Sequence, residues 1–197
     1  METLKSTLQQ RTARFVILSL ALLLGAATAT VAAKSGEWSW VERDPVKLEL
    51  VMQLVVTCSD PETVGGTGDS KDGKRTEIWP IIGGRFEGKG IRGKVIPGGG
   101  DFPVVRPDGV EVVDALYRLR TDDGVTIIIH NKGMSYPVNK PGEWRYRLAP
   151  EFIAPQGKYE WLNSSLFIST LSDVPPEMSL AKGAKENDRL IQIYRVL

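Results

Sequence analysis

The chain has 197 residues, of which 42% are hydrophobic, and its 25 Lys and Arg residues are nearly balanced by 24 Asp and Glu residues. This length suits one domain with a substantial core, and the charge balance argues against a protein that wraps nucleic acid. A single cysteine, Cys58, and a single histidine, His130, exclude an internal disulfide framework, a zinc site built on several thiolates and a two-histidine metal centre.

The first 33 residues are typical of a secretory signal peptide. Arg11 and Arg14 precede the apolar run Phe15–Leu24, and small residues follow it from Gly25 to Ala33. The alternative is an uncleaved membrane anchor, because the uncharged stretch Phe15–Ala33 approaches the ~20 residues that a spanning helix needs. We therefore expect a secreted or periplasmic protein in which residues 34–197 form a single domain.

Beyond residue 45 the apolar segments are short, rich in β-branched residues and separated by Gly or Pro. In the segment from Leu48 to Val56, side chains alternate with the period of two that is typical of a strand. Further strands are predicted at Thr76–Ile82, Arg85–Glu87, Ile91–Ile96, Val110–Arg120, Val125–Asn131, Trp144–Ala149, Tyr159–Thr170 and Leu190–Val196. No segment after the signal shows sustained helical periodicity, so helix is expected to be scarce.

Turn residues separate these predicted strands. Asp108-Gly109 and Asp123-Gly124 predict tight hairpin turns, because Asp and Gly tolerate the backbone angles that such turns need. Pro97, followed by three glycines, is expected to end a strand and begin a loop. The polar, Gly-rich stretch Ser59–Arg75 predicts a long, mobile surface loop.

The number and spacing of these strands indicate an all-β fold. We expect a closed or nearly closed antiparallel β-barrel, preceded by the helix of the signal. Closure removes the strand edges that invite aggregation. In Val110–Arg120, side chains from Val113, through Ala115 and Tyr117, to Leu119 share one face, which we expect to point inward.

Several polar residues are candidates for a functional site. Asp101 follows three glycines and caps no predicted turn, so it is the best candidate for a general base. Asn131 shares a face with apolar residues of its strand and is expected to point inward. Its neighbour His130 then points to solvent.

The apolar segment Tyr159–Thr170 also contains polar residues. If it is a strand, Trp161 and Asn163 share one face and offer a flat apolar wall with an amide beside it. The other reading of Asn163 is an amide that bonds to backbone groups near a turn. Asn163-Ser164-Ser165 also matches the glycosylation sequon, although an apolar strand is a poor place for a glycan.

Five strings in chain order resemble one bacterial and fungal family: GGRFEGKGIRGKVIPGGGDF, RPDGVEVVDALYRLRTDDG, NKG, YEWLNSSLF and the closing IYRV. The family is catalogued as a domain of unknown function, number 3237. This resemblance implies a compact, lipocalin-like (calycin-type) antiparallel barrel and no settled activity. The family's recurrent polar and aromatic positions correspond to Asp101, Arg106, Asp108, Asp114, Tyr117, Asn131, Trp161 and Asn163.

Three functions remain open. The leading hypothesis is an exported barrel that binds a small, mostly apolar or aromatic molecule, with the candidate ligand-binding residues Tyr117, Asn131, Trp161, Asn163 and Arg106. The second is a cofactor-free isomerase, cyclase or lyase in which Asp101 acts as the base. The third is a structural envelope protein whose barrel is filled by its own side chains. We expect no cofactor, no metal and no nucleic acid, and a membrane contact only if the signal is uncleaved.

Overall fold

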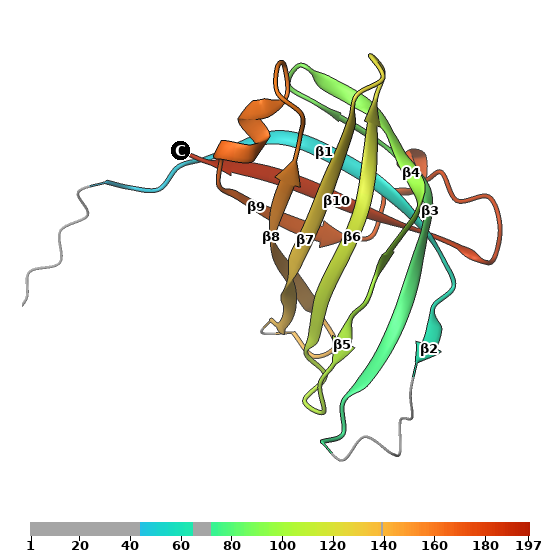
Figure 1. Cartoon of the computed structure of the whole chain (residues 1–197). Coiled ribbons are helices and arrows are strands. Elements are labelled where there is room, and N and C mark those ends of the chain that lie inside the picture. The colour runs from blue at the N-terminus through green and yellow to red at the C-terminus, as the bar shows by residue number, and fades with distance from the viewer. Residues whose placement is uncertain (1–43, 65–71, 139) are drawn as a thin grey trace, which may run out of the picture. The chain divides into compact units, whose positions relative to one another are not determined.

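The computed structural model of this chain describes residues 44–64, 72–138 and 140–197 (Figure 1). The predicted signal peptide, residues 1–33, lies outside these described residues. In the part of the chain that is described, no helix is long and apolar enough to span a membrane.

The described residues are almost entirely β-strand. Two short 3-10 helices interrupt the strands, η1 (Glu160–Ser164) and η2 (Pro176–Met178). The strands are β1 (Leu48–Ser59), β2 (Glu62–Val64), β3 (Arg75–Gly88), β4 (Ile91–Asp101), β5 (Val104–Val105), β6 (Glu111–Thr121), β7 (Thr126–Pro137), β8 (Trp144–Ile153), β9 (Phe167–Ser172) and β10 (Glu186–Val196).

Eight antiparallel strands close into a barrel, in the order β1, β10, β9, β8, β7, β6, β4 and β3. Closure occurs because β1 pairs with β10 along one edge and with β3 along the other. Figure 1 shows β1 and β10 crossing steeply behind the sheet formed by β8, β7 and β6. The short strands β2 and β5 add to β3, and β5 also pairs with β6. The predicted all-β antiparallel barrel is therefore confirmed.

The alternation of side chains places the core inside the barrel. In β6 the predicted inward face is confirmed, because Val113, Ala115, Tyr117 and Leu119 are all buried. The predicted hairpin between β6 and β7 is also confirmed: its turn contains Gly124 at a φ of 86°, a backbone conformation that glycine adopts without strain.

The prediction that Pro97 ends a strand is wrong. Strand β4 continues past Pro97 and the following glycines to Asp101. Its register shifts between Ile96 and Gly100 against β6, which is the signature of a bulge that accommodates the missing proline N–H. Gly99 allows close packing there, because a Cβ atom at this position would lie 2.5 Å from the Cβ of Tyr117. Asp101 therefore lies at the end of a strand, not in a loop.

The strands predicted separately at Thr76–Ile82 and Arg85–Glu87 form the single strand β3. Two other predicted segments also differ from the structure. The predicted strand Tyr159–Thr170 is a 3-10 helix followed by the shorter strand β9. The predicted loop Ser59–Arg75 contains β2, which pairs with β3 through Glu62 and Ile78. Residues 65–71 of that loop lie outside the described residues.

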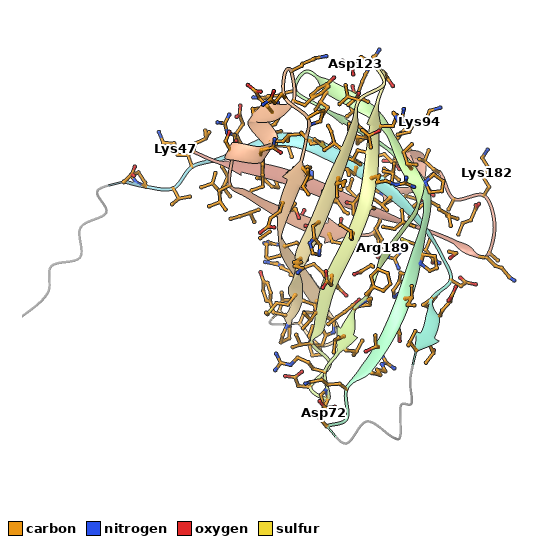
Figure 2. The ribbon with its side chains drawn as sticks, in the orientation of Figure 1. Lys47, Asp72, Lys94, Asp123, Lys182 and Arg189 are labelled. Atoms are coloured by element: carbon orange, nitrogen blue, oxygen red, sulfur yellow. The ribbon has the colours of Figure 1, made fainter. Side chains whose placement is uncertain are left out.

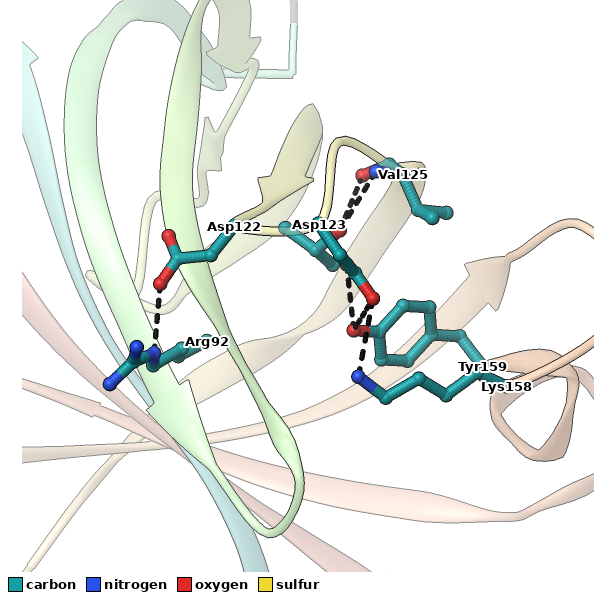
Figure 3. A network of polar contacts seen from close by, with 7 residues as sticks. Arg92, Asp122, Asp123, Val125, Lys158 and Tyr159 are labelled. Atoms are coloured by element: carbon teal, nitrogen blue, oxygen red, sulfur yellow. Dashed lines mark hydrogen bonds and ion pairs between the residues drawn. The ribbon is translucent and has the colours of Figure 1, made fainter.

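A polar network surrounds the β6–β7 turn at one end of the barrel (Figure 3). The hydroxyl of Tyr159, just before η1, donates to the Asp123 carboxylate at 2.9 Å, and Lys158 pairs with the same carboxylate at 3.2 Å. A hydrogen bond from the Thr121 side chain is the largest of the effects that lower the pKa of Asp123 to about 2. The contacts with Tyr159 and Lys158 act in the same direction. The network ties the start of η1 to the turn, and the buried Tyr159 and Leu162 belong to the hydrophobic core at this end.

Candidate functional site

A cavity of about 270 Å³ lies inside the half of the barrel away from this network. The strand register places it, because its wall includes the last residue of β4 and the first residue of β6, which adjoin β5 rather than the β6–β7 turn. In Figure 2, Asp123 is labelled at the end that carries this network, and Arg189, a cavity residue, is labelled between Asp123 and Asp72. An eight-stranded barrel has room for either packed side chains or one small ligand.

Most of the cavity wall is apolar. It includes the side chains of Val56, Ile81, Val113, Ala115, Leu171 and Ile191, together with one face formed by Trp79. The polar members of the wall are Asp101, Glu111, Tyr117, Asn131, Tyr146 and Arg189. An apolar chamber with a few convergent polar groups is the usual composition of a small-molecule site.

Asp101 faces the cavity from the end of β4. It pairs in register with Ala115 on β6, which in turn pairs with Asn131 on β7. Asp101 Oδ1 accepts a hydrogen bond from the backbone N–H of Asp114 at 2.9 Å. Burial raises the pKa of the Asp101 carboxyl, the Asp114 N–H lowers it and the nearby Glu111 raises it, and together these effects bring it to about 6.

Tyr117 and Asn131 present polar atoms that have no partner within the described part of the protein. Their side chains are 2% and 1% exposed, and the unpartnered atoms are Tyr117 Oη and Asn131 Nδ2. The Ser169 hydroxyl donates to Asn131 Oδ1 at 3.0 Å, which orients the amide and leaves its N–H groups available. Burial also raises the pKa of Tyr117, so its hydroxyl stays protonated and remains a donor.

Two further contacts shape the wall. Tyr146 on β8 donates its hydroxyl to Glu111 Oε2 at 2.6 Å. The Arg189 guanidinium lies 5.3 Å from the ring centroid of Trp79, in a cation–π contact, and donates to the backbone carbonyl of Asp188 at 2.9 Å. Among the described residues, Arg189 forms no ion pair with a carboxylate within 4.0 Å.

Cys58 also lines the cavity. Burial raises the pKa of its thiol to about 11, although the nearby Arg189 lowers it. The thiol is therefore neutral at physiological pH, which makes it a poor nucleophile. Cys58 contributes to the cavity as a small apolar group.

The structure separates the predicted site residues into two groups. Asp101, Tyr117 and Asn131 line the cavity. Arg106 does not: it is exposed and pairs with Asp108 at 2.5 Å in the turn between β5 and β6. Nor do Trp161 and Asn163 line it: they lie in η1, which contributes no residue to the cavity wall.

The contacts of Trp161 and Asn163 are structural. Trp161 packs against Phe167 with ring centroids 5.9 Å apart. Asn163 Oδ1 accepts from the backbone N–H of Ala154 at 2.8 Å, and its Nδ2 donates to the carbonyl of the same residue at 2.8 Å. This is the backbone-satisfying role that the sequence left open for Asn163.

Sequence reasoning missed four polar or aromatic members of the wall, namely Trp79, Glu111, Tyr146 and Arg189. Strand alternation contained a signal for all four. Trp79 has the same parity as the buried Ile81, and Glu111 has the same parity as the buried Val113 and Ala115. Tyr146 has the same parity as the buried Leu148, and Arg189 has the same parity as the buried Ile191 and Ile193. A charged residue in phase with a buried strand face is a marker for an interior site.

Comparisons with known proteins find one family and a consistent fold. The profile described as "Protein of unknown function (DUF3237)" matches residues 46–196. A UPF0311 protein of Clostridium acetobutylicum is 32% identical over 144 residues, which cover 67% of this chain and 89% of that relative.

Solved structures show the same barrel. A crystal structure of a protein of unknown function from Clostridium acetobutylicum superposes with a TM-score of 0.66 and 28% identity, over 79% of this chain and 100% of that chain. A crystal structure of an enzyme from Penicillium herquei superposes with a TM-score of 0.57 and 22% identity, over 81% of this chain and 100% of that chain. At that identity the second likeness concerns the fold alone.

Proposed function

This chain belongs to the family described as proteins of unknown function (DUF3237), and we propose that its barrel binds one small, mostly apolar molecule that carries an acceptor oxygen. The observation that carries this proposal is the pair of buried donors, Tyr117 Oη and Asn131 Nδ2, that have no partner among the described residues and lie in a mostly apolar cavity. A carbonyl, ether or hydroxyl oxygen of a ligand would accept from both.

The energetic cost of these donors supports a binding role. Leaving a buried polar group unpaired costs about 1–3 kcal/mol, whereas an apolar replacement of similar shape carries no such cost. Tyr117 packs within the hydrophobic core, where a phenylalanine ring would fill the same space without a hydroxyl. A hydroxyl at this position is explained by a partner that arrives with the ligand.

The same cavity favours a binding protein over the alternative of a barrel packed solid for structural purposes. Side chains of Ala115 and Cys58 are small, and they leave the space beside Tyr117 and Asn131 unfilled. We also propose that the protein acts outside the cytoplasm, on the basis of the signal-like segment at residues 1–33.

Calorimetric titration with 2-tetralone, a bicyclic ketone that is mostly apolar and has one carbonyl oxygen, tests the binding role. We expect one molecule to bind per chain. The Tyr117→Phe variant should bind at least about fivefold more weakly, the equivalent of one lost hydrogen bond of ~1 kcal/mol. The matched control is Tyr136→Phe, which removes the hydroxyl of an exposed tyrosine outside the cavity.

Native mass spectrometry of the protein purified from its own host provides a second measurement, because it detects ligands that remain bound during purification. The proposal is wrong if 2-tetralone does not bind and no small molecule co-purifies. It is also wrong if Tyr117→Phe and Tyr136→Phe bind the ketone equally well.

A further inference from the structure

We propose that the cavity is a catalytic site for proton transfer at a carbon next to a carbonyl group, with Asp101 as the general base and with Tyr117 and Asn131 stabilising the enolate oxygen. This inference rests on the proposed binding function and adds a reaction and a substrate class, namely small ketones and related carbonyl compounds with an acidic α-hydrogen.

The positions of the three residues suit this reaction. Asp101 and Asn131 lie on the same register row, one strand on either side of Ala115. Two strand spacings separate their backbones by roughly 10 Å, and the small side chain of Ala115 leaves the space between them open. Tyr117 lies two residues along β6 on the same inward face. A carbonyl compound fits between them with its oxygen at the donors and its α-carbon toward Asp101.

The two donors are suited to hold developing negative charge. Both are neutral groups, buried, and fixed in place: Asn131 by Ser169 and Tyr117 by close packing against Gly99. Hydrogen-bond donors that already point at the site where charge develops are worth more in a dry cavity than in water, because they need no reorganisation during the reaction. Within the described part of the chain, neither donor has an acceptor that would compete with the substrate oxygen.

The carboxylate is placed and tuned as a base. The backbone N–H of Asp114 anchors one oxygen of Asp101. Burial raises the Asp101 pKa to about 6, so at pH 7 the group is mostly ionised yet is a stronger base than an exposed aspartate. The neighbouring Glu111 carboxylate, which accepts from Tyr146, acts in the same direction.

The reaction balances without a cofactor or an oxidant. The Asp101 carboxylate takes a proton from the α-carbon, and the electron pair of that C–H bond forms the carbon–carbon double bond of the enolate. The π electrons of the carbonyl move onto its oxygen, which accepts hydrogen bonds from Tyr117 and Asn131. Protonated Asp101 then returns the proton to the same carbon or to a conjugated carbon, which gives exchange, epimerisation or double-bond migration.

Proton exchange into 2-tetralone, followed by NMR in deuterated buffer, tests the inference on the full chain. We expect the wild-type protein to accelerate exchange of the α-hydrogens above the buffer rate. Asp101→Asn should lower this acceleration at least about 100-fold, the usual contribution of a general base, while calorimetry shows binding within a few-fold of wild type. Asp173→Asn, which alters an exposed carboxylate outside the cavity, is the matched control.

Tyr117→Phe provides a second variant that keeps the shape of the core. We expect it to slow exchange more than it weakens binding, because the enolate oxygen carries more charge than the ketone oxygen. The pH dependence of wild-type exchange should rise through a midpoint near pH 6, where Asp101 ionises.

The outcomes separate this inference from the binding function. If the wild-type protein binds 2-tetralone and does not accelerate exchange, catalysis is wrong and binding stands. If the Asp101→Asn variant accelerates exchange as much as the wild-type protein does, Asp101 is not the base and the inference is overturned. If the ketone does not bind at all, the proposed function fails and this inference fails with it.

Discussion

Asp101 is anchored by the backbone of Asp114, whose own side chain points to the opposite face of the barrel. Asp101 Oδ1 accepts from the Asp114 N–H at 2.9 Å, while the Asp114 carboxylate contacts His130 Nε2 at 2.5 Å. The two acidic groups are thus close in the fold and differ in environment. The interior one has a raised pKa because it is buried.

The raised pKa of Asp101 predicts a pH-dependent stability. The folded state holds the Asp101 proton up to about pH 6, whereas the unfolded chain releases it near the ordinary aspartate pKa of 3.8. The folded state therefore binds more protons between these values, and the free energy of unfolding decreases as pH rises from about 4 to 6 or slightly above. The contribution lost is roughly 3 kcal/mol.

Urea denaturation across this pH range measures the effect. Asp101→Asn should flatten the profile and be more stable than wild type at pH 7.5, because the amide cannot ionise and can still accept from Asp114. Asp173→Asn should keep the wild-type slope. A wild-type profile that rises from pH 4 to pH 7 in parallel with the Asp101→Asn profile would contradict this account.

The burial of Tyr117 predicts that two substitutions at this position change the free energy of unfolding differently. Tyr117→Ala should lower the free energy of unfolding by about 3–5 kcal/mol, as expected when a fully buried aromatic ring is removed. Tyr117→Phe should leave it unchanged or raise it by up to about 1 kcal/mol, because it removes a buried hydroxyl that has no hydrogen-bond partner among the residues that the structure describes. Chemical denaturation of the ligand-free variants checks both values. A loss below about 1 kcal/mol for Tyr117→Ala would show that the ring is not part of the core.

The contacts of Asn163 predict that replacing it lowers stability and leaves ligand binding unchanged. Asn163→Ala removes two hydrogen bonds to the backbone of Ala154 and should cost about 1–2 kcal/mol of stability. Binding of 2-tetralone should stay at the wild-type level, because η1 does not line the cavity. Thermal unfolding and calorimetry measure the two quantities, with Ser164→Ala as the neighbouring control. A tenfold loss of affinity would place Asn163 in the site after all.

The signal-like N-terminal segment predicts that the chain is cleaved during export. We expect a mature N-terminus between Thr30 and Lys34 in protein recovered from the native host, because a ten-residue apolar run is followed by small residues. N-terminal sequencing measures this directly. Retention of Met1 in a membrane fraction would instead support the uncleaved anchor.

Strand alternation determined which way most side chains point. The positions of Tyr117 and Asn131 follow from it, because successive residues of a strand face opposite sides and their neighbours are apolar. The hairpin at Asp123-Gly124 follows from local turn chemistry in the same way. These features depend on residues close together in the chain, so the sequence alone was sufficient.

The composition of the cavity was decided by the tertiary structure. Asp101, Tyr146 and Arg189 come from β4, β8 and β10, and they share one chamber only because β1 closes the barrel between β10 and β3. Asn163 became a structural residue because η1 places it against Ala154. Apolar periodicity in the segment Tyr159–Thr170 did not distinguish a strand from a 3-10 helix followed by a strand, since both bury the same residue types. Register across a closed sheet depends on long-range pairing, and no local pattern encodes it.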